Sequence, residues 1–324
     1  MRSLILALSC GCASNVSGPT FEYGEFGDLV SVTLVGDGVD VVAGNEKAFV
    51  CLESGGVVVF DVSNPNAPVE ERRIFTGEPC VGVDLVGSKL VLLTTTMVRT
   101  IAPNNMMVKG EYSLAFSAQA MSMDPGWEVL WIVGEDDKGA TWIEELEFRE
   151  SAQMYSMRTV STSVGNPVSL TEFSEAVVVA SDDGQLRVLE QEALSEVSVW
   201  SPDAAFDEEN LFVIADDEGV VYVNLGPGGV RSIDLSIPAE PQTLGSWGEE
   251  ETRGLLVMEE RAYVGLESGL AVLDIANPSE LSIIGAENIS LDIAIHPASI
   301  TVEDGFAYLM DPDSGNLALV NVVE

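Results

Sequence analysis

Residues 48–68 read AFVCLESGGVVVFDVSNPNAP, and this stretch decides the fold. Two apolar runs, Ala48–Leu52 and Val57–Val62, flank a Glu-Ser-Gly-Gly turn, and an Asn-Pro pair follows the second run. Because glycine adopts positive φ at little steric cost, the stretch predicts a β-hairpin followed by a turn. The same unit returns at residues 262–278 as AYVGLESGLAVLDIANP, with one residue fewer after the turn. A duplicate so far along the chain indicates a protein built of repeats.

Short apolar segments rich in valine and leucine recur along the 324-residue chain, separated by Gly, Asp, Asn and Pro. No long amphipathic helical run interrupts them, so the class is all-β. The segments group into seven sets, which predicts a seven-bladed β-propeller of four-stranded antiparallel blades. In the fifth set we expect strands at Ala204–Asp207, Leu211–Ala215, Val220–Leu225 and Val230–Ile237.

The last set, between residues 299 and 322, is one strand short, and the other end of the chain has a spare strand at Leu29–Val35. We expect this N-terminal strand to complete the last blade and close the ring, because closure buries the two end edges that a linear array would expose. An open β-solenoid is the alternative. In a solenoid, however, there would be no reason for the strand missing at one end of the chain to be matched by a spare strand at the other end.

The net charge is extreme, since 53 acidic residues stand against 14 basic ones and give −39 at pH 7. Nucleic acid is excluded as a partner, because phosphate binding needs clustered Lys and Arg. Two interpretations stay open. The charge serves solubility, as in a saline habitat where salt screens the repulsion, or it forms a surface for Ca²⁺ or for a basic partner.

The first residues, Met1–Ser14, read MRSLILALSCGCAS and combine Arg2, a short apolar run and two cysteines among small residues. This is similar to a bacterial lipoprotein signal, in which the cysteine after the cleavage site becomes lipidated. We expect lipidation at Cys10, with Cys12 as the alternative. A plain secretory signal and a start codon placed too far downstream are further possibilities. Residues 1–12 are thus expected to be a signal peptide, 13–27 a tether and 28–324 the propeller.

The blade that ends V-V-V-F-D-V-S-N-P-x-x-P at Val57–Pro68 resembles the LVIVD-repeat family, and Leu270–Pro278 fits the same signature without the final proline. The other five sets keep only the hairpin and its polar turn. The resemblance implies an exported prokaryotic surface protein or lipoprotein without an assigned activity. It therefore implies a binding scaffold and no reaction.

Carboxylates recur at one end of the predicted blades. In an up-and-down blade, the turns between the second and third strands emerge on the same face as the connections between blades. Six of these seven turns carry acids, and such a ring would attract cations, although Asp and Gly are also what tight turns prefer. The candidate metal ligands on this face are Asp136, Asp137, Asp182, Asp183, Asp216, Asp217, Asp311 and Asp313. Ca²⁺ is the cation these ligands would suit, and no other cofactor is expected.

Cys51 and Cys80 remain in the mature body on adjacent blades, either as a disulfide or as buried free thiols. His296 is the only histidine and cannot build a multi-histidine metal site, so we expect a structural or exposed role. The sequence has no P-loop, G-x-S-x-G, C-x-x-C or H-E-x-x-H motif, and no catalytic residue is assigned.

These observations predict a non-enzymatic, exported and lipid-anchored propeller that acts as a monomeric binding scaffold at the cell envelope. Its partner is expected to be a protein or glycan, and a basic partner would suit the net charge. The propeller is expected to meet the membrane only through the anchor. A propeller-type hydrolase or lyase that uses carboxylates with Ca²⁺ is one alternative. It would draw on the carboxylates expected near the axis, Asp40, Asp84, Glu172 and Asp207. A subunit of an envelope assembly complex is the other alternative.

Overall fold

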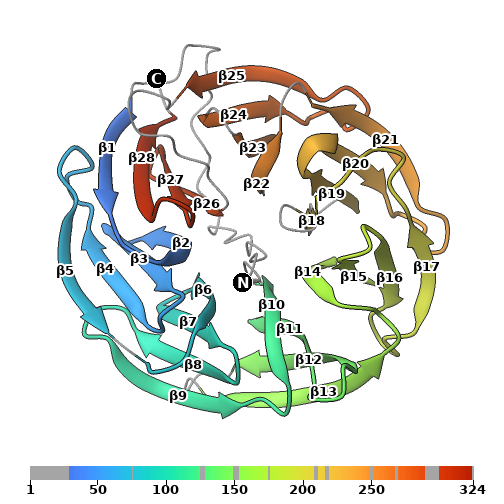
Figure 1. Ribbon diagram of the computed structural model, residues 1–324, viewed down its shortest axis with the longest axis horizontal. Coiled ribbons are helices and arrows are strands. Elements are labelled where there is room, and N and C mark those ends of the chain that lie inside the picture. The colour runs from blue at the N-terminus through green and yellow to red at the C-terminus, as the bar shows by residue number, and fades with distance from the viewer. Residues whose placement is uncertain are drawn as a thin grey trace.

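The computed structural model describes residues 29–74, 76–124, 128–148, 153–173, 176–207, 211–215, 219–248, 251–266, 269–288 and 299–322. Seven antiparallel sheets of four strands stand around a central axis as the blades of a propeller (Figure 1). The all-β prediction and the count of seven blades are confirmed. No helix in the described part of the chain is long and apolar enough to cross a membrane.

Each blade runs from an inner first strand to an outer fourth strand, and the blades follow one another in chain order (Figure 1). Blade 1 holds β2 (Gly38–Gly44), β3 (Lys47–Leu52), β4 (Val57–Asp61) and β5 (Val69–Ile74), and blade 2 holds β6 (Cys80–Val86), β7 (Lys89–Thr94), β8 (Met97–Ala102) and β9 (Met107–Ser113). Blade 3 holds β10 (Ser117–Asp124), β11 (Val129–Glu135), β12 (Thr141–Phe148) and β13 (Met154–Thr162), and blade 4 holds β14 (Pro167–Phe173), β15 (Ala176–Ser181), β16 (Leu186–Glu190) and β17 (Glu196–Trp200). Blade 5 holds β18 (Leu211–Ala215), β19 (Val220–Leu225), β20 (Val230–Asp234) and β21 (Gln242–Trp247), and blade 6 holds β22 (Thr252–Met258), β23 (Arg261–Leu266), β24 (Gly269–Asp274) and β25 (Ser282–Asn288).

Blade 7 joins the two ends of the chain. Its inner strands are β26 (Ser299–Glu303), β27 (Phe306–Asp311) and β28 (Asn316–Asn321), and its outer strand is β1 (Leu29–Leu34). β1 pairs antiparallel with β28 and carries a register shift between Leu29 and Ser31. The third and fourth strands of the other six blades carry the same kind of shift. The N-terminal strand therefore takes the place of an ordinary outer strand, as the strand count predicted.

The apolar core is divided among the spaces between blades. Seven clusters of buried side chains can be distinguished among the described residues, and each lies between two neighbouring blades. The seam between blades 7 and 1, for example, packs Val41, Val50 and Val58 against Met310 and Leu317. Both faces of each sheet are buried against neighbouring blades, which explains why the strands read as nearly continuous apolar runs.

The fifth blade differs from the sequence prediction. Residues 204–207 form no strand, and the blade begins one strand later, at β18. Its true outer strand, β21, has the sequence QTLGSW, which is too polar and glycine-containing to stand out as a strand. The apolar pair that suggested a strand at residues 204–207 packs instead: Ala204 contacts the apolar cluster between blades 4 and 5, and the ring of Phe206 covers Gly184.

The Asp-x-x-x-Pro loop of the family signature has the same geometry in three blades. The aspartate carboxylate accepts the N–H of the residue two positions later: Ser63 to Asp61, Ser236 to Asp234, and Ala276 to Asp274. This is an Asx turn, which stabilises the reversal after the third strand. Hydrogen bonds from its own serine lower the pKa of Asp234, as they do for Asp61. Residues 234–241, DLSIPAEP, are thus a third copy of the loop, and Ile237 in the asparagine position hid it in the sequence.

The proline of this loop connects neighbouring blades. The Ser198 hydroxyl on β17 donates to the Pro238 carbonyl oxygen at 2.5 Å, and the Ser232 hydroxyl on β20 donates to the Pro278 oxygen at 2.5 Å. Ser232 also accepts the Gly245 N–H at 2.9 Å. The signature loops of blades 5 and 6 are therefore each fastened to the blade before them, and the motif contributes to these two seams of the ring.

We expect Ser232→Ala to lower the free energy of unfolding by about 1–2 kcal/mol, because it leaves a part-buried carbonyl and an N–H without their partner. Urea unfolding followed by circular dichroism measures the loss. The control is Ser279→Ala, an exposed serine on the loop that Ser232 contacts, which should change stability by less than about 0.5 kcal/mol. Equal effects of the two variants would contradict a fastening role for Ser232.

Candidate functional site

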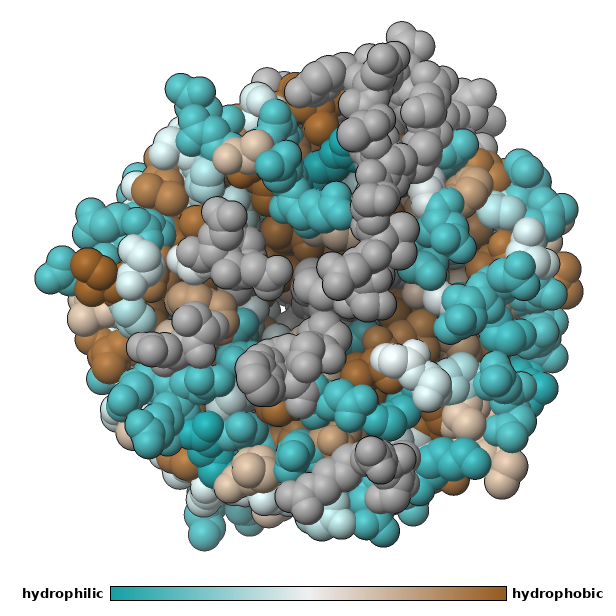
Figure 2. All heavy atoms as spheres, turned by 180° about the vertical axis from the view of Figure 1, so that it is seen from behind, coloured by the Kyte–Doolittle hydropathy of each residue, from teal (hydrophilic) through white to brown (hydrophobic). Residues whose placement is uncertain are grey.

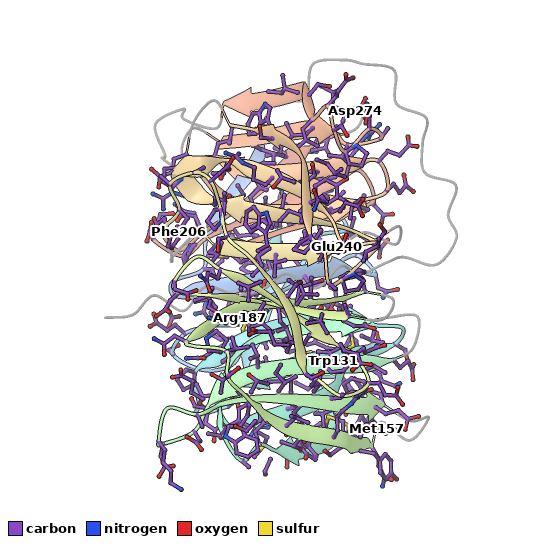
Figure 3. The ribbon with its side chains drawn as sticks, turned by 90° about the vertical axis from the view of Figure 1, so that its right-hand side faces the viewer. Trp131, Met157, Arg187, Phe206, Glu240 and Asp274 are labelled. Carbon is purple, nitrogen blue, oxygen red and sulfur yellow. A yellow bond between two sulfur atoms is a disulfide. The ribbon has the colours of Figure 1, made fainter. Side chains whose placement is uncertain are left out.

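The predicted site is the face formed by the turns between second and third strands and the connections between blades. Figure 3 shows the disc from its side, with Phe206 of such a connection at one edge and with Glu240 and Asp274, next to the signature loops, toward the other. The two faces are therefore distinct surfaces made of different loops. We call the first the turn face and the second the signature face.

The turn of blade 3 holds Asp136 and Asp137. One Asp136 oxygen accepts the N–H groups of Lys138 and Ala140 at 2.9 and 3.0 Å, and the other accepts the Trp142 indole N–H at 3.1 Å. The bond from the Ala140 backbone, then that from Trp142, lowers the pKa of Asp136 below its ordinary value of 3.8. Asp136 shapes its turn, and Asp137 is the exposed carboxylate that the turn presents.

In blade 4, both acids of the turn accept hydrogen bonds. Asp182 accepts the Asn166 side-chain N–H at 2.6 Å, and Asp183 accepts the Gln185 N–H at 3.1 Å. The Arg187 guanidinium lies 3.5 Å from Asp183. Gly184 has a φ of +79°, and a Cβ there would stand 2.5 Å from the Phe206 ring, so only glycine suits this position. Phe206 itself remains 36% exposed at the edge of the turn face.

Blade 7 holds Asp311 and Asp313 in the same arrangement. Asp311 is fully buried and accepts the N–H groups of Asp313 and Ser314, at 2.9 and 3.3 Å, together with the Ser314 hydroxyl at 2.6 Å. Asp313 is exposed and lies 3.1 Å from Arg253 of blade 6. In the turns of blades 3 and 7, one carboxylate fixes the loop while a second one faces solvent.

The turn of blade 2, Thr94–Thr96, is the one that the sequence left without an acid, and the structure supplies one from elsewhere. Glu78, in the connection before β6, accepts the hydroxyls of Thr94 and Thr96 at 2.7 and 3.0 Å. Sequence reasoning missed this residue because the partners are 16 and 18 positions apart. The usable signal was the threonine run, whose hydroxyls need an acceptor.

Asp216 and Asp217, the candidates in the predicted turn of blade 5, lie outside the described part of the chain. The strands of this blade were predicted one strand early, because its first and second strands are β18 and β19. The corresponding turn of blade 5 is Gly226–Gly229, which has no acid.

Among the described residues, no group of three or more His, Cys, Asp or Glu side chains is arranged to hold a metal ion. The candidate ligands sit on separate blades, and several already accept hydrogen bonds from their own turns. Cys10, Cys12, the tether, Glu267 and His296 lie outside the described residues.

The carboxylates considered for acid–base chemistry have separate local partners. Asp40 on β2 and Asp84 on β6 are both buried, and Asp84 accepts the Leu85 N–H at 2.6 Å. Glu172 on β14 accepts the Gln191 side-chain N–H at 2.6 Å. Asp207 lies in the connection before blade 5, not on an inner strand.

The structure joins Cys51 on β3 to Cys80 on β6 in a disulfide, with Cα atoms 5.7 Å apart. Both residues are buried in the apolar cluster between blades 1 and 2. Since β3 and β6 belong to different blades, the bond crosses a seam of the ring. Its strands bring the two cysteines together although 29 positions separate them.

Comparison with known proteins agrees with this architecture. The family model described as "LVIVD repeat" matches residues 36–76 and 251–288, so the chain carries LVIVD repeats in blades 1 and 6. No curated protein shows significant sequence similarity to the chain.

Solved propellers share the fold at low identity. The β-propeller domain of Cps50 (Swd1) from Myceliophteria thermophila has a TM-score of 0.68 at 9% identity, covering 92% of this chain and 100% of that one. BamB from Moraxella catarrhalis has a TM-score of 0.58 at 14% identity, covering 90% and 99%. A chain of the Mitotic Checkpoint Complex has a TM-score of 0.71 at 11% identity, covering 100% and 99%. These likenesses establish the propeller and nothing about the ligand.

We expect the disulfide to be required for full stability. Replacing Cys51 and Cys80 by serine should lower the free energy of unfolding by about 3–4 kcal/mol, the usual value for a loop of this size. Urea unfolding with and without reductant measures the change. Reductant should weaken the wild type and leave the double variant unchanged. The disulfide assignment is contradicted if reductant does not change the stability of the wild type even when it is added to the unfolded protein, where the bond is accessible.

Proposed function

We propose that the protein is an exported, non-enzymatic binding scaffold of the cell envelope, held at a membrane by a lipid on Cys10 or, alternatively, Cys12. The lipoprotein-like residues 1–14 support export. The Cys51–Cys80 disulfide supports it independently, because such bonds persist in oxidising compartments and are rare in the cytosol.

One observation carries the binding role: on the turn face, buried or hydrogen-bonded acids fix the loops that present exposed acids. Asp136 with Asp137, and Asp311 with Asp313, are the clearest pairs. Because the loops are fixed, this surface would lose little conformational freedom when a partner binds. The long-range field of a −39 chain would also speed the approach of a basic partner.

The partner class that fits this surface is a protein with exposed Lys and Arg, and a glycan is the other candidate. The described arginines are largely engaged already, as Arg187 is with Asp183 and Glu196, so the surface offers few cations to nucleic acid. We propose that the scaffold acts as a monomer and needs no cofactor. Ca²⁺ is the remaining candidate ligand, through exposed acids such as Asp313.

The test compares two variants of equal charge. Four exposed acids of the turn face (Glu53→Gln, Asp137→Asn, Asp183→Asn, Asp313→Asn) are neutralised in one variant, and four exposed acids of the signature face (Glu46→Gln, Glu240→Gln, Glu259→Gln, Glu280→Gln) in the other. Calorimetry with an oligolysine peptide at low salt is expected to show at least about tenfold weaker binding for the turn-face variant only. The same titration with CaCl₂ tests the cation.

Equal loss in the two variants would mean that only net charge matters, and would contradict a binding surface on the turn face. Binding of oligolysine that persists in both variants would contradict it as well. Heat from CaCl₂ that disappears only in the turn-face variant would assign calcium to that face.

The anchor is tested by labelling cells with a palmitate analogue. Wild-type protein should be labelled, and Cys10→Ser should remove the label while Cys12→Ser keeps it. The reverse result would place the lipid on Cys12, and unlabelled wild-type protein would contradict a lipid anchor.

A further inference from the structure

Asp40 is a buried acid at the seam where the ring closes. It lies on β2, the inner strand of blade 1, and only 2% of its surface is exposed. One carboxyl oxygen accepts the Ser299 hydroxyl of blade 7 at 2.7 Å and the Val41 N–H at 2.9 Å. The other oxygen accepts the Val83 N–H of blade 2 at 2.9 Å. A single side chain therefore connects blades 7, 1 and 2.

We call Asp40 and the groups that bind it the Asp40 node. Covalent and backbone contacts strengthen it. Asp40 is paired in the sheet with Cys51, which forms the disulfide to Cys80 on the strand that also carries Val83. Ser299 in turn accepts the Val41 N–H at 3.1 Å. The inner strands are edge strands with one sheet neighbour each, and side chains of the preceding blade accept the Val41 and Val83 N–H groups.

A hydroxyl is sufficient for this task elsewhere in the ring. Ser169 on β14 of blade 4 accepts the Val213 N–H of blade 5 at 3.2 Å, and Ser299 does the same for Val41. At the equivalent place in blade 1, the acceptor is an ionisable carboxyl group. The geometry needs an acceptor there, but it does not need one that carries a charge.

No cation compensates this carboxyl group among the described residues packed against β2. Lys47 is the one cation on those strands, and it lies at the other end of β3, 2.6 Å from Glu71. Asp84 on β6 accepts the Leu85 N–H, and Asp311 on β27 accepts groups of its own turn. The remaining titratable groups on the strands packed against β2 are Cys51 and Cys80, which are oxidised, with Glu303 on β26 and Tyr308 on β27.

We propose that Asp40 is a proton-sensitive latch of the closing seam, which holds blades 7, 1 and 2 together most tightly when protonated and loosens them when it ionises. The protonated form keeps its contacts because the Ser299 hydroxyl can accept as well as donate. The ionised form keeps the same neighbours but places an uncompensated charge in an apolar seam.

The direction of the pH effect follows from burial. Burial, only partly offset by the bonds from Ser299, Val83 and Val41, raises the pKa of Asp40 from 3.8 to about 6. The folded state therefore holds this proton more tightly than the unfolded state. Its contribution is fully present below the unfolded value, falls as the pH rises toward 6, and is lost above that.

The test is the stability of the oxidised protein from pH 4 to 7.5, measured by urea unfolding in 0.5 M NaCl, which screens the repulsion among surface acids. The folding equilibrium constant of the wild type is expected to fall by up to about a hundredfold over this range. Asp40→Asn, which keeps the shape and cannot ionise, should remove most of that fall. Asp136→Asn is the control and should preserve it, because the bonds from Ala140 and Trp142 lower the pKa of Asp136 and keep it ionised over this range. Asp84→Asn removes the other buried carboxyl group of these strands and tests whether the fall belongs to that group.

A fall of the same size in Asp40→Asn would overturn the latch, as would a fall that disappears in Asp84→Asn instead. Ser299→Ala gives a second, independent readout if Asp40→Asn does not fold. It removes a donor to the charged carboxyl group, so the fall should move to higher pH. An unshifted pH profile in Ser299→Ala would contradict the proposal.

Discussion

Every apolar cluster formed by the described residues lies between two blades, so within the described part of the chain no blade has a core of its own. Each sheet must therefore have a neighbour on both faces, and a row of seven blades satisfies this only when it closes. Closure depends on β1, which pairs with β28 as the outer strand of blade 7 and so completes the blade that packs against blade 1. The hydrogen bond from Val35 N–H to the Gly315 oxygen at 2.8 Å, and that from Arg73 to the Val35 oxygen at 3.2 Å, fix the chain as it passes into blade 1.

Other contacts also hold neighbouring blades together, near the closing seam or at other seams of the ring. The Cys51–Cys80 disulfide and the Asp40 node reinforce the neighbouring seam between blades 1 and 2. The proline carbonyl of the signature loop does similar work at the seams of blades 4, 5 and 6, where serines of the preceding blade donate to it. In Figure 2, hydrophilic side chains cover much of the visible face, with apolar ones scattered among them, whereas the apolar clusters lie in the seams between blades.

Much of this could be predicted from the sequence because it rests on local patterns. The hairpin at Ala48–Pro68, its copy in blade 6 and the surplus strand at Leu29–Val35 were sufficient for the fold and for the mode of closure. Blade 5 was misread because QTLGSW lacks the alternation of an ordinary strand, and its strands were therefore predicted one strand early.

Contacts between distant residues were beyond the sequence. Glu78 reaches the threonines of the next turn, and Asp40 meets Ser299 from the far end of the chain, although neither pair leaves a local pattern. The sequence identified the exposed acids Asp137, Asp183 and Asp313 as candidates. It did not show that neighbouring acids hold the turns through hydrogen bonds. Which acid fixes a turn and which one faces solvent depends on the N–H groups that the loop leaves without a backbone partner.

The dependence of the whole ring on β1 is tested most directly by comparing a chain that begins at residue 29 with one that begins at residue 36. If closure is the controlling constraint, the longer chain unfolds in one cooperative step, and the shorter one loses that step and self-associates through the bare edge of β28. A peptide of residues 29–35 should restore the cooperative transition to the shorter chain. Equal and cooperative unfolding of both chains without the peptide would contradict the account.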